Sequence, residues 1–162
     1  MLTVYCLGIV LLTVIDQLSK WLVCRFMPLQ SSVGIWKNIF HLTYIQNKGA
    51  AMGLLQGQLW LFFLVTILVV VFVTVYVIKK RPANPLLITS LTLVVGGALG
   101  NFIDRLFRGY VVDFLDFSGL YFPYIFNLAD CFVVCGAFLL AFYVIFIEGK
   151  EKKQKETQEG KE

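Results

Sequence analysis

The chain has 162 residues, of which 59% are hydrophobic and 15% charged, and its formal net charge is +4. Its mean hydropathy is +0.80. Soluble domains are nearer half apolar and a quarter charged, so this composition excludes an ordinary soluble domain and predicts a membrane protein. No basic surface interleaved with aromatic residues is visible, so we expect no nucleic acid partner.

Long runs without charge divide the chain into candidate membrane spans. They cover residues 1–15, 59–78, 85–103 and 131–147. A helix needs about 20 apolar residues to cross the hydrocarbon core, so the first run must include Asp16 and Lys20, and the last extends backwards over Asp130. We predict four transmembrane helices. The first is expected to be retained, because no basic residue precedes Lys20 and no small-x-small cleavage site follows it.

Basic residues near the span ends predict the orientation. Residues 79–81 read Lys-Lys-Arg, and residues 149–162 form a polar tail rich in lysine. Both should be cytoplasmic, which places the N- and C-termini on the cytoplasmic side. Six other basic residues then fall on the outer side against the rule, and they require counter-charges or an anionic ligand. These residues are Lys20, Arg25, Lys37, Lys48, Arg105 and Arg108.

Two pieces between the spans should lie on the outer side. In residues 26–58, the stretch 39–45 is rich in β-branched and aromatic residues and predicts a strand, so we expect a small sheet on the membrane surface. Residues 56–58 read as a hinge into the second span. The second piece, about 107–126, carries five aromatics typical of an interfacial belt. The expected organisation is a transmembrane domain over 1–148 followed by the disordered tail.

The acidic residues are sharply partitioned. Every glutamate lies after Ile147, in or beside the tail, whereas all five aspartates lie in or beside apolar stretches. A carboxylate at membrane depth is costly and is therefore a functional-site hypothesis. Asp16 stands four residues before Lys20, which predicts either a neutralising ion pair or one wall of a polar site. Asp116 is expected at the surface or in a loop.

Two further motifs place polar groups beside small residues. In residues 47–52, Asn47 precedes a glycine and two alanines, which permit close approach of another backbone. Residues 96–105 end the third span, with Gly96 and Gly100 forming a small-xxx-small face. Their polar end, Asn101, Asp104 and Arg105, is either a self-neutralising helix end or an inward-facing row of side chains.

Asp113 and Asp130 are the most informative pair. Each aspartate lies among apolar residues near the outer membrane surface, and a turn-rich loop separates them. Two facing carboxylates hold one proton between them, which supplies a general base and a general acid for peptide hydrolysis by water. The alternative is two separate helix caps. With a single histidine, His41, and no Cys-x-x-Cys pair, neither a metal site nor a Ser-His-Asp triad is expected.

Five motifs together resemble the bacterial lipoprotein signal peptidase (signal peptidase II) family. In chain order they are Asp16-Gln17-x-Ser19-Lys20, Asn47-x-Gly49-Ala50-Ala51, Gly100-Asn101-x-x-Asp104-Arg105, Val112-Asp113-Phe114 and Phe126-Asn127-x-Ala129-Asp130. The chain departs from the family's usual pattern at Ser19, where threonine is common, and at Met52, where an aromatic is common.

The resemblance implies a bacterial cytoplasmic-membrane aspartyl peptidase with an extracytoplasmic β-cradle over about 26–58. Such an enzyme removes the signal peptide of prolipoproteins before a diacylglyceryl-modified cysteine, on the outer side, without a metal or other cofactor. Asp113 and Asp130 match the catalytic pair. The residues that match supporting positions are Asp16, Asn47, Asn101, Asp104, Arg105, Asn127 and Ala129.

The expected partners are lipidated prolipoproteins and membrane lipids, and we expect a monomer. Two rival functions remain open. Intramembrane carboxylates also serve proton-coupled transporters, although transport sites usually lie near the membrane midplane. The aspartates could also hold helices together in a non-catalytic assembly protein.

Overall fold

The computed structural model describes residues 1–37, 39–49, 58–122 and 124–150. Ala50, Ala51, Met52, the first two residues of the predicted hinge and the tail beyond Lys150 lie outside this range. Within it, four helices are long and apolar enough to cross a membrane. They are α1 (Leu2–Phe26), α2 (Leu59–Lys80), α3 (Pro85–Arg108) and α4 (Leu128–Tyr143), which continues as the π-helical turn η3 (Val144–Glu148).

The sequence sets the ends of α3. Asn84 caps its N-terminus, because the side chain accepts hydrogen bonds from the backbone N–H groups of Leu86 and Leu87 at 2.8 and 3.3 Å. Pro85 occupies the first helical position, where no N–H is needed. At the other end, Gly109 takes the left-handed conformation (φ 75°) that terminates the helix.

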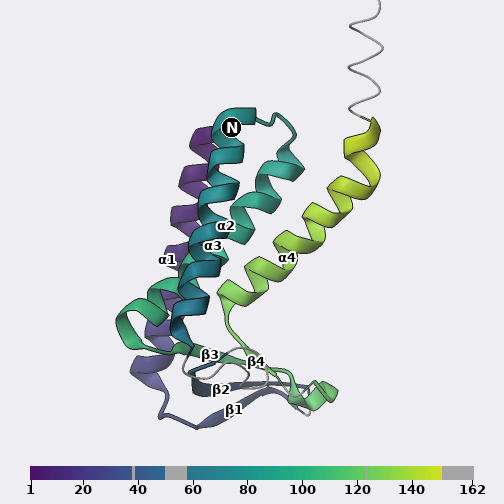
Figure 1. Ribbon diagram of the computed structural model, residues 1–162. Helices are drawn as coiled ribbons and strands as arrows, with labels where there is room; N and C mark the ends of the chain where they lie inside the picture. Colours follow the sequence, from purple (N-terminus) through teal and green to yellow (C-terminus); the bar gives the residue numbers. More distant parts are fainter. Residues whose placement is uncertain (38, 50–57, 123, 151–162) are drawn as a thin grey trace, which may run out of the picture.

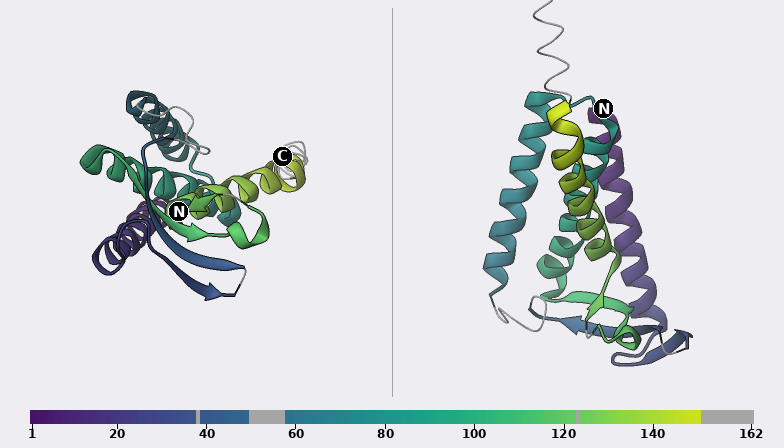
Figure 2. Two further views of the ribbon diagram at one scale, coloured as in Figure 1. Left: turned by 90° about the horizontal axis from the view of Figure 1, so that it is seen from below. Right: turned by 90° about the vertical axis from the view of Figure 1, so that its right-hand side faces the viewer.

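Helix α3 is the centre of the bundle. It contacts each of the other three helices, and half of its most apolar stretch is buried, against about a tenth or less for the others. Figures 1 and 2 show α1, α2 and α4 arranged around it. The other helices therefore present mostly apolar faces to the surroundings, as expected for lipid-facing spans.

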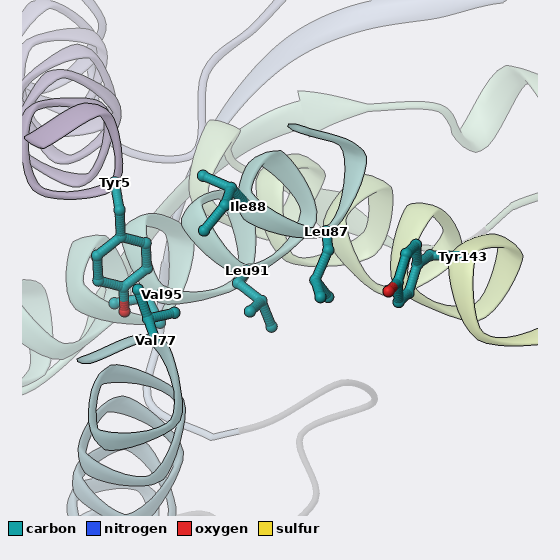
Figure 3. Close-up of a cluster of buried hydrophobic side chains, with 7 residues drawn as sticks. All are labelled: Tyr5, Val77, Leu87, Ile88, Leu91, Val95 and Tyr143. Atoms are coloured by element: carbon teal, nitrogen blue, oxygen red, sulfur yellow. The ribbon is translucent and has the colours of Figure 1, made fainter. Parts of the chain in front are cut away.

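One hydrophobic cluster joins all four helices (Figure 3). It is built on α3, whose Leu87, Ile88, Leu91 and Val95 are each at most 5% exposed. The other members are Tyr5 of α1, Val77 of α2 and Tyr143 of α4. Within it, Tyr5 Oη and Thr74 Oγ1 form a 3.0 Å hydrogen bond between α1 and α2, so the buried phenol is not left unpaired.

Glycines of α3 allow its neighbours to approach closely. A Cβ at Gly96 would lie 3.0 Å from the Leu12 side chain, and one at Gly100 would lie 2.5 Å from Asp16 Oδ2. The small-xxx-small face predicted from the sequence therefore packs against α1. On another face, a Cβ at Gly97 would collide with the Ala129 carbonyl of α4.

A four-stranded antiparallel sheet covers one end of the bundle, at the opposite end from the N-terminus and from η3 (Figures 1 and 2). Its order is β1-β2-β3-β4. The strands are β1 (Ser32–Trp36), β2 (Phe40–Asn47), β3 (Val111–Asp116) and β4 (Ile125–Phe126), with a 3₁₀ turn η2 (Ser118–Leu120) between the last two. We call this the sheet end.

The predicted fold class, four apolar helices with a small sheet, is confirmed. The sequence analysis, however, confined the sheet to the first external piece, and half of its strands come from the second. The β2–β3 register pairs Ile45 with Asp113 and Asn47 with Val111. This pairing is what brings Asn47 and Asp113, 66 residues apart, to the same place.

Candidate functional site

Asp113 lies on β3 and is 2% exposed. Both of its carboxylate oxygens accept a hydrogen bond from an asparagine. Asn127 Nδ2 donates to Oδ1 at 2.6 Å, and Asn47 Nδ2 donates to Oδ2 at 2.9 Å. Two amides from different elements therefore fix the orientation of this carboxyl group.

Asp130 lies in the first turn of α4 and forms a capping box with Asn127. The Asp130 N–H donates to Asn127 Oδ1 at 3.0 Å, and the Asn127 N–H donates to Asp130 Oδ2 at 3.1 Å. Asn101 Nδ2 of α3 donates to the remaining oxygen, Oδ1, at 2.7 Å. Asp130 thus takes part in a helix cap, but the two aspartates are not separate, because the capping residue Asn127 also donates to Asp113.

Asn127 makes this connection, and it is fully buried. Its two amide hydrogens are both used, one by Asp113 Oδ1 and the other by Asn101 Oδ1 at 3.0 Å. Its amide oxygen and backbone N–H are taken by Asp130. One asparagine therefore sets the positions of both aspartates relative to each other.

The surroundings of Asp113 favour its protonated form. Burial, and then the negative charge of Asp130, raise the pKa of Asp113 to about 7, although hydrogen bonds from Asn47 and Asn127 oppose the shift. A carboxyl group with a pKa near 7 can both hold and release a proton at neutral pH. The negative charge of Asp130 is thus one of the two causes that keep a proton on Asp113 near neutral pH.

A buried cation, Lys20, contacts the residues that support this pair. The ammonium group of Lys20 on α1 contacts Asp16 Oδ2 at 2.8 Å, Asp104 Oδ2 at 3.2 Å and Asn101 Oδ1 at 2.9 Å. Lys20 is fully buried, and its three N–H donors match these three acceptors. The sequence indicated only the pairing with Asp16, four residues away. The contacts with α3 had no signal in the sequence, so Lys20 was missed as a site residue.

Asp16 and Asp104 tie the bundle to the site. Asp16 Oδ1 accepts a hydrogen bond at 3.0 Å from the backbone N–H of Ala129, which immediately precedes Asp130. Asp104 Oδ2 accepts one at 3.0 Å from the backbone N–H of Val112, which immediately precedes Asp113. Each supporting carboxylate therefore holds the backbone next to one member of the predicted catalytic pair.

Arg105 does not pair with its neighbour Asp104, whose ion pairs are with Lys20 and Arg108. Its guanidinium carbon lies 4.3 Å from the centre of the Phe62 ring on α2, a cation–π distance. Among the described residues, Arg105 has no ion pair within 4 Å. This end of α3 is therefore more than a self-neutralising helix terminus.

Asp116 is not the surface residue that the sequence analysis expected. It closes β3 and is 8% exposed. Thr43 Oγ1 donates to its Oδ2 at 2.6 Å, and the Ser118 N–H donates to its Oδ1 at 2.9 Å. Burial alone would raise the pKa of Asp116, but these hydrogen bonds outweigh it and lower the pKa. The prediction failed because nothing in the sequence showed that this stretch is a paired strand.

The predicted site residues thus converge from α1, α3, β2, β3 and α4 at the sheet end. In the described part of the chain, no group of three or more His, Cys, Asp or Glu side chains is arranged to hold a metal ion. What the arrangement offers instead is two oriented carboxyl groups, one of them with a pKa near neutrality.

Comparison with known proteins gives one consistent result. Residues 8–146 match the family model described as signal peptidase (SPase) II. The lipoprotein signal peptidase of Geobacillus thermodenitrificans is 45% identical over 139 residues, 85% of this chain and 87% of that protein. The one from Clostridioides difficile is 44% identical over 91% of this chain and 99% of its own length. A solved bacterial membrane enzyme superposes with a TM-score of 0.84 at 32% identity, covering 90% of this chain and 89% of the other.

Proposed function

Because this chain belongs to the signal peptidase II family, we propose that its lipoprotein signal peptidase activity is that of an aspartyl endopeptidase. The substrate is a diacylglyceryl-modified prolipoprotein, and cleavage takes place before the lipidated cysteine. The observation that carries the proposal is the double connection through Asn127, which holds Asp113 and Asp130 in one hydrogen-bonded unit. No other described group of side chains combines two hydrogen-bonded carboxyl groups of which one, here Asp113, has a pKa of about 7.

The reaction uses the one proton that the two carboxyl groups share. The ionised carboxylate removes a proton from a water molecule as the water oxygen attacks the scissile carbonyl carbon. The protonated carboxyl donates its proton to the carbonyl oxygen, and a tetrahedral intermediate forms. The carboxyl group that took the proton from water then gives it to the nitrogen as the C–N bond breaks, and this nitrogen becomes the amino group of the lipidated cysteine. One hydroxyl of the intermediate returns its proton to the other carboxylate as the C=O bond re-forms. The pair ends with one proton, as it began.

The supporting residues fall into two groups. Asn47, Asn101 and Asn127 hold the carboxyl groups at hydrogen-bonding distances of 2.6–2.9 Å. Arg105 is the candidate for contacting the substrate, because its guanidinium has no carboxylate partner among the described residues and packs on Phe62. A planar group with five donors suits a peptide carbonyl next to the scissile bond.

The orientation of the chain is part of the proposal. The chain is a multi-pass membrane protein with bacterial relatives. We infer that both termini are cytoplasmic and that the sheet end, with the site, faces outwards. The basic residues Lys79, Lys80 and Arg81 support this, because they close α2 at the end of the bundle that carries the N-terminus and η3 (Figures 1 and 2). Substrate would enter from the bilayer as a lipidated prolipoprotein, and we expect the enzyme to act as a monomer.

The test is cleavage of a diacylglyceryl-modified prolipoprotein by the purified chain in lipid. Asp113→Asn and Asp130→Asn each remove a carboxyl group that takes or gives the proton. Because the two carboxyl groups act as a unit, the loss of either one should reduce turnover at least a thousandfold. Asp116→Asn is the matched control. This buried aspartate, also on β3, accepts its hydrogen bonds from Thr43 and Ser118, so its replacement should leave turnover unchanged. Near-normal turnover in either of the first two variants would refute the assignment.

A further inference from the structure

A groove at the sheet end is separate from the two aspartates. It has a volume of about 430 Å³. Its lining comes from the end of β2, the start of α2 and the segment that joins α3 to β3, and it consists of Gln46, Lys48, Leu59, Arg108, Gly109 and Tyr110. The groove combines two cations, an amide and a phenol with the apolar side chain of Leu59. The volume lies within the range of small-ligand sites, and the two cations favour an anionic ligand.

The alternation of side chains along β2 separates the groove from the aspartates. Successive side chains of a strand point to opposite faces. Asn47 points to Asp113, so Gln46 points to the other face, where its Nε2 donates to Tyr44 Oη at 3.3 Å. The groove therefore opens on the face of β2 away from the predicted catalytic pair.

The positive charge of the groove is poorly neutralised. Arg108 has one ion pair, at 3.5 Å to Asp104 Oδ1, and Asp104 already receives Lys20 at 3.2 Å. Lys48 is exposed and forms no ion pair within the described residues. The residues left undescribed outside the tail, 38, 50–57 and 123, include no acidic residue. Lys48 and Arg108 belong to the six basic residues that the sequence predicts on the outer side and that require counter-charges or an anionic ligand. Among the described residues, Lys48 has no carboxylate partner.

The groove lies where two candidate membrane spans end. Arg108 is the last residue of the third candidate span, and Leu59 is the first residue of the second. Trp60, beside Leu59, is 63% exposed, as expected for an aromatic at the membrane interface. A ligand in the groove would therefore meet cations at headgroup level and an apolar side chain at the start of the hydrocarbon core.

We propose that this groove binds the phosphodiester headgroup of an anionic phospholipid from the leaflet at the sheet end. The phosphate would lie between Lys48 and Arg108, Tyr110 and Gln46 would donate to its oxygens or to the glycerol, and the acyl chains would pass Leu59 into the bilayer. The inference does not depend on the peptidase mechanism.

The test is retention of phosphatidylglycerol by the full chain. The protein is placed in nanodiscs of phosphatidylcholine with increasing phosphatidylglycerol, and lipids that stay bound are counted by native mass spectrometry. A lysine near an anionic membrane surface strengthens binding about fivefold. Lys48→Gln should therefore lower the apparent affinity for phosphatidylglycerol about fivefold, and Lys48→Arg should preserve it.

Lys37→Gln provides the matched control, because Lys37 is an exposed lysine in the turn between β1 and β2, also at the sheet end but outside the groove. It should leave retention unchanged. Equal losses for Lys37→Gln and Lys48→Gln would overturn the proposal in favour of a general surface charge effect. Displacement of the lipid by equimolar inorganic phosphate would overturn the choice of a lipid ligand. For the wild-type chain, phosphatidylglycerol retention must also weaken between 0.05 and 0.5 M NaCl, and salt-independent retention would contradict a charge-based site.

Discussion

Removing the ammonium group of Lys20 is the sharpest test of how the site is held together. Lys20→Met keeps a long unbranched side chain but leaves Asp16 and Asp104 buried without their shared counter-charge. Both carboxylates are fully buried, and their contacts with Lys20 are 2.8 and 3.2 Å long. Breaking one buried ion pair by removing a partner costs about 3–5 kcal/mol, because an uncompensated charge remains. We expect a loss of unfolding free energy in that range.

Function should fail together with stability. Lys20 also donates to Asn101 Oδ1 at 2.9 Å, and Asn101 donates in turn to Asp130 Oδ1 at 2.7 Å. Without the ammonium group, the Asn101 amide oxygen keeps only the hydrogen bond from Asn127 and loses one of the two contacts that orient the amide toward Asp130. Turnover of the folded variant should therefore fall about tenfold to a hundredfold, as is usual when an outer supporting contact of a site is lost.

The measurement is reversible unfolding of the chain in mixed micelles with increasing SDS, read by circular dichroism, together with turnover in lipid. Lys37→Met is the control, because Lys37 is exposed and has no ion pair within the described residues. The double variant Asp16→Asn with Lys20→Met should be more stable than Lys20→Met alone, since one orphaned carboxylate is gone. A Lys20→Met protein within 1 kcal/mol of wild type, with full turnover, would refute the reasoning.

Three further outcomes are expected. Asp113 has a pKa of about 7 in the folded chain, above its unfolded value, so its proton stabilises the fold fully below about pH 4 and this contribution is lost as the pH rises to 7. In pH-dependent unfolding, Asp130→Asn should move the midpoint of this loss to lower pH, because the neighbouring negative charge is gone. An unchanged midpoint would exclude charge repulsion between the two aspartates. Gly100→Ala would place a Cβ 2.5 Å from Asp16 Oδ2 and should cost about 1–3 kcal/mol in the SDS assay, whereas Gly149→Ala, in open space, should be neutral. Asp116→Asn removes a charged acceptor and should cost about 1–2 kcal/mol in the same assay without changing turnover, so loss of turnover in the folded variant would show that β3 transmits the change to the site.

Several features of the site follow from local sequence. A buried aspartate is expensive wherever it lies, so its presence in an apolar stretch indicates a special environment before any contact is known. The caps of α3 at Asn84 and Gly109 and the small face at Gly96 and Gly100 are equally local. They depend on residue type and on a spacing of four or fewer, which a helix converts directly into geometry.

The sequence by itself determined four apolar spans and the polar positions that cannot be left alone inside them, because hydropathy and helical spacing act over short distances. Only the tertiary structure decided which hydrogen-bond and ion-pair partners these polar side chains have. Lys20 was missed and Asp116 was wrongly placed at the surface because their decisive contacts join residues more than seventy positions apart. Such contacts depend on helix packing and strand register, and no local pattern encodes either. The same register separates the face of β2 that holds Asp113 from the face that carries the cationic groove.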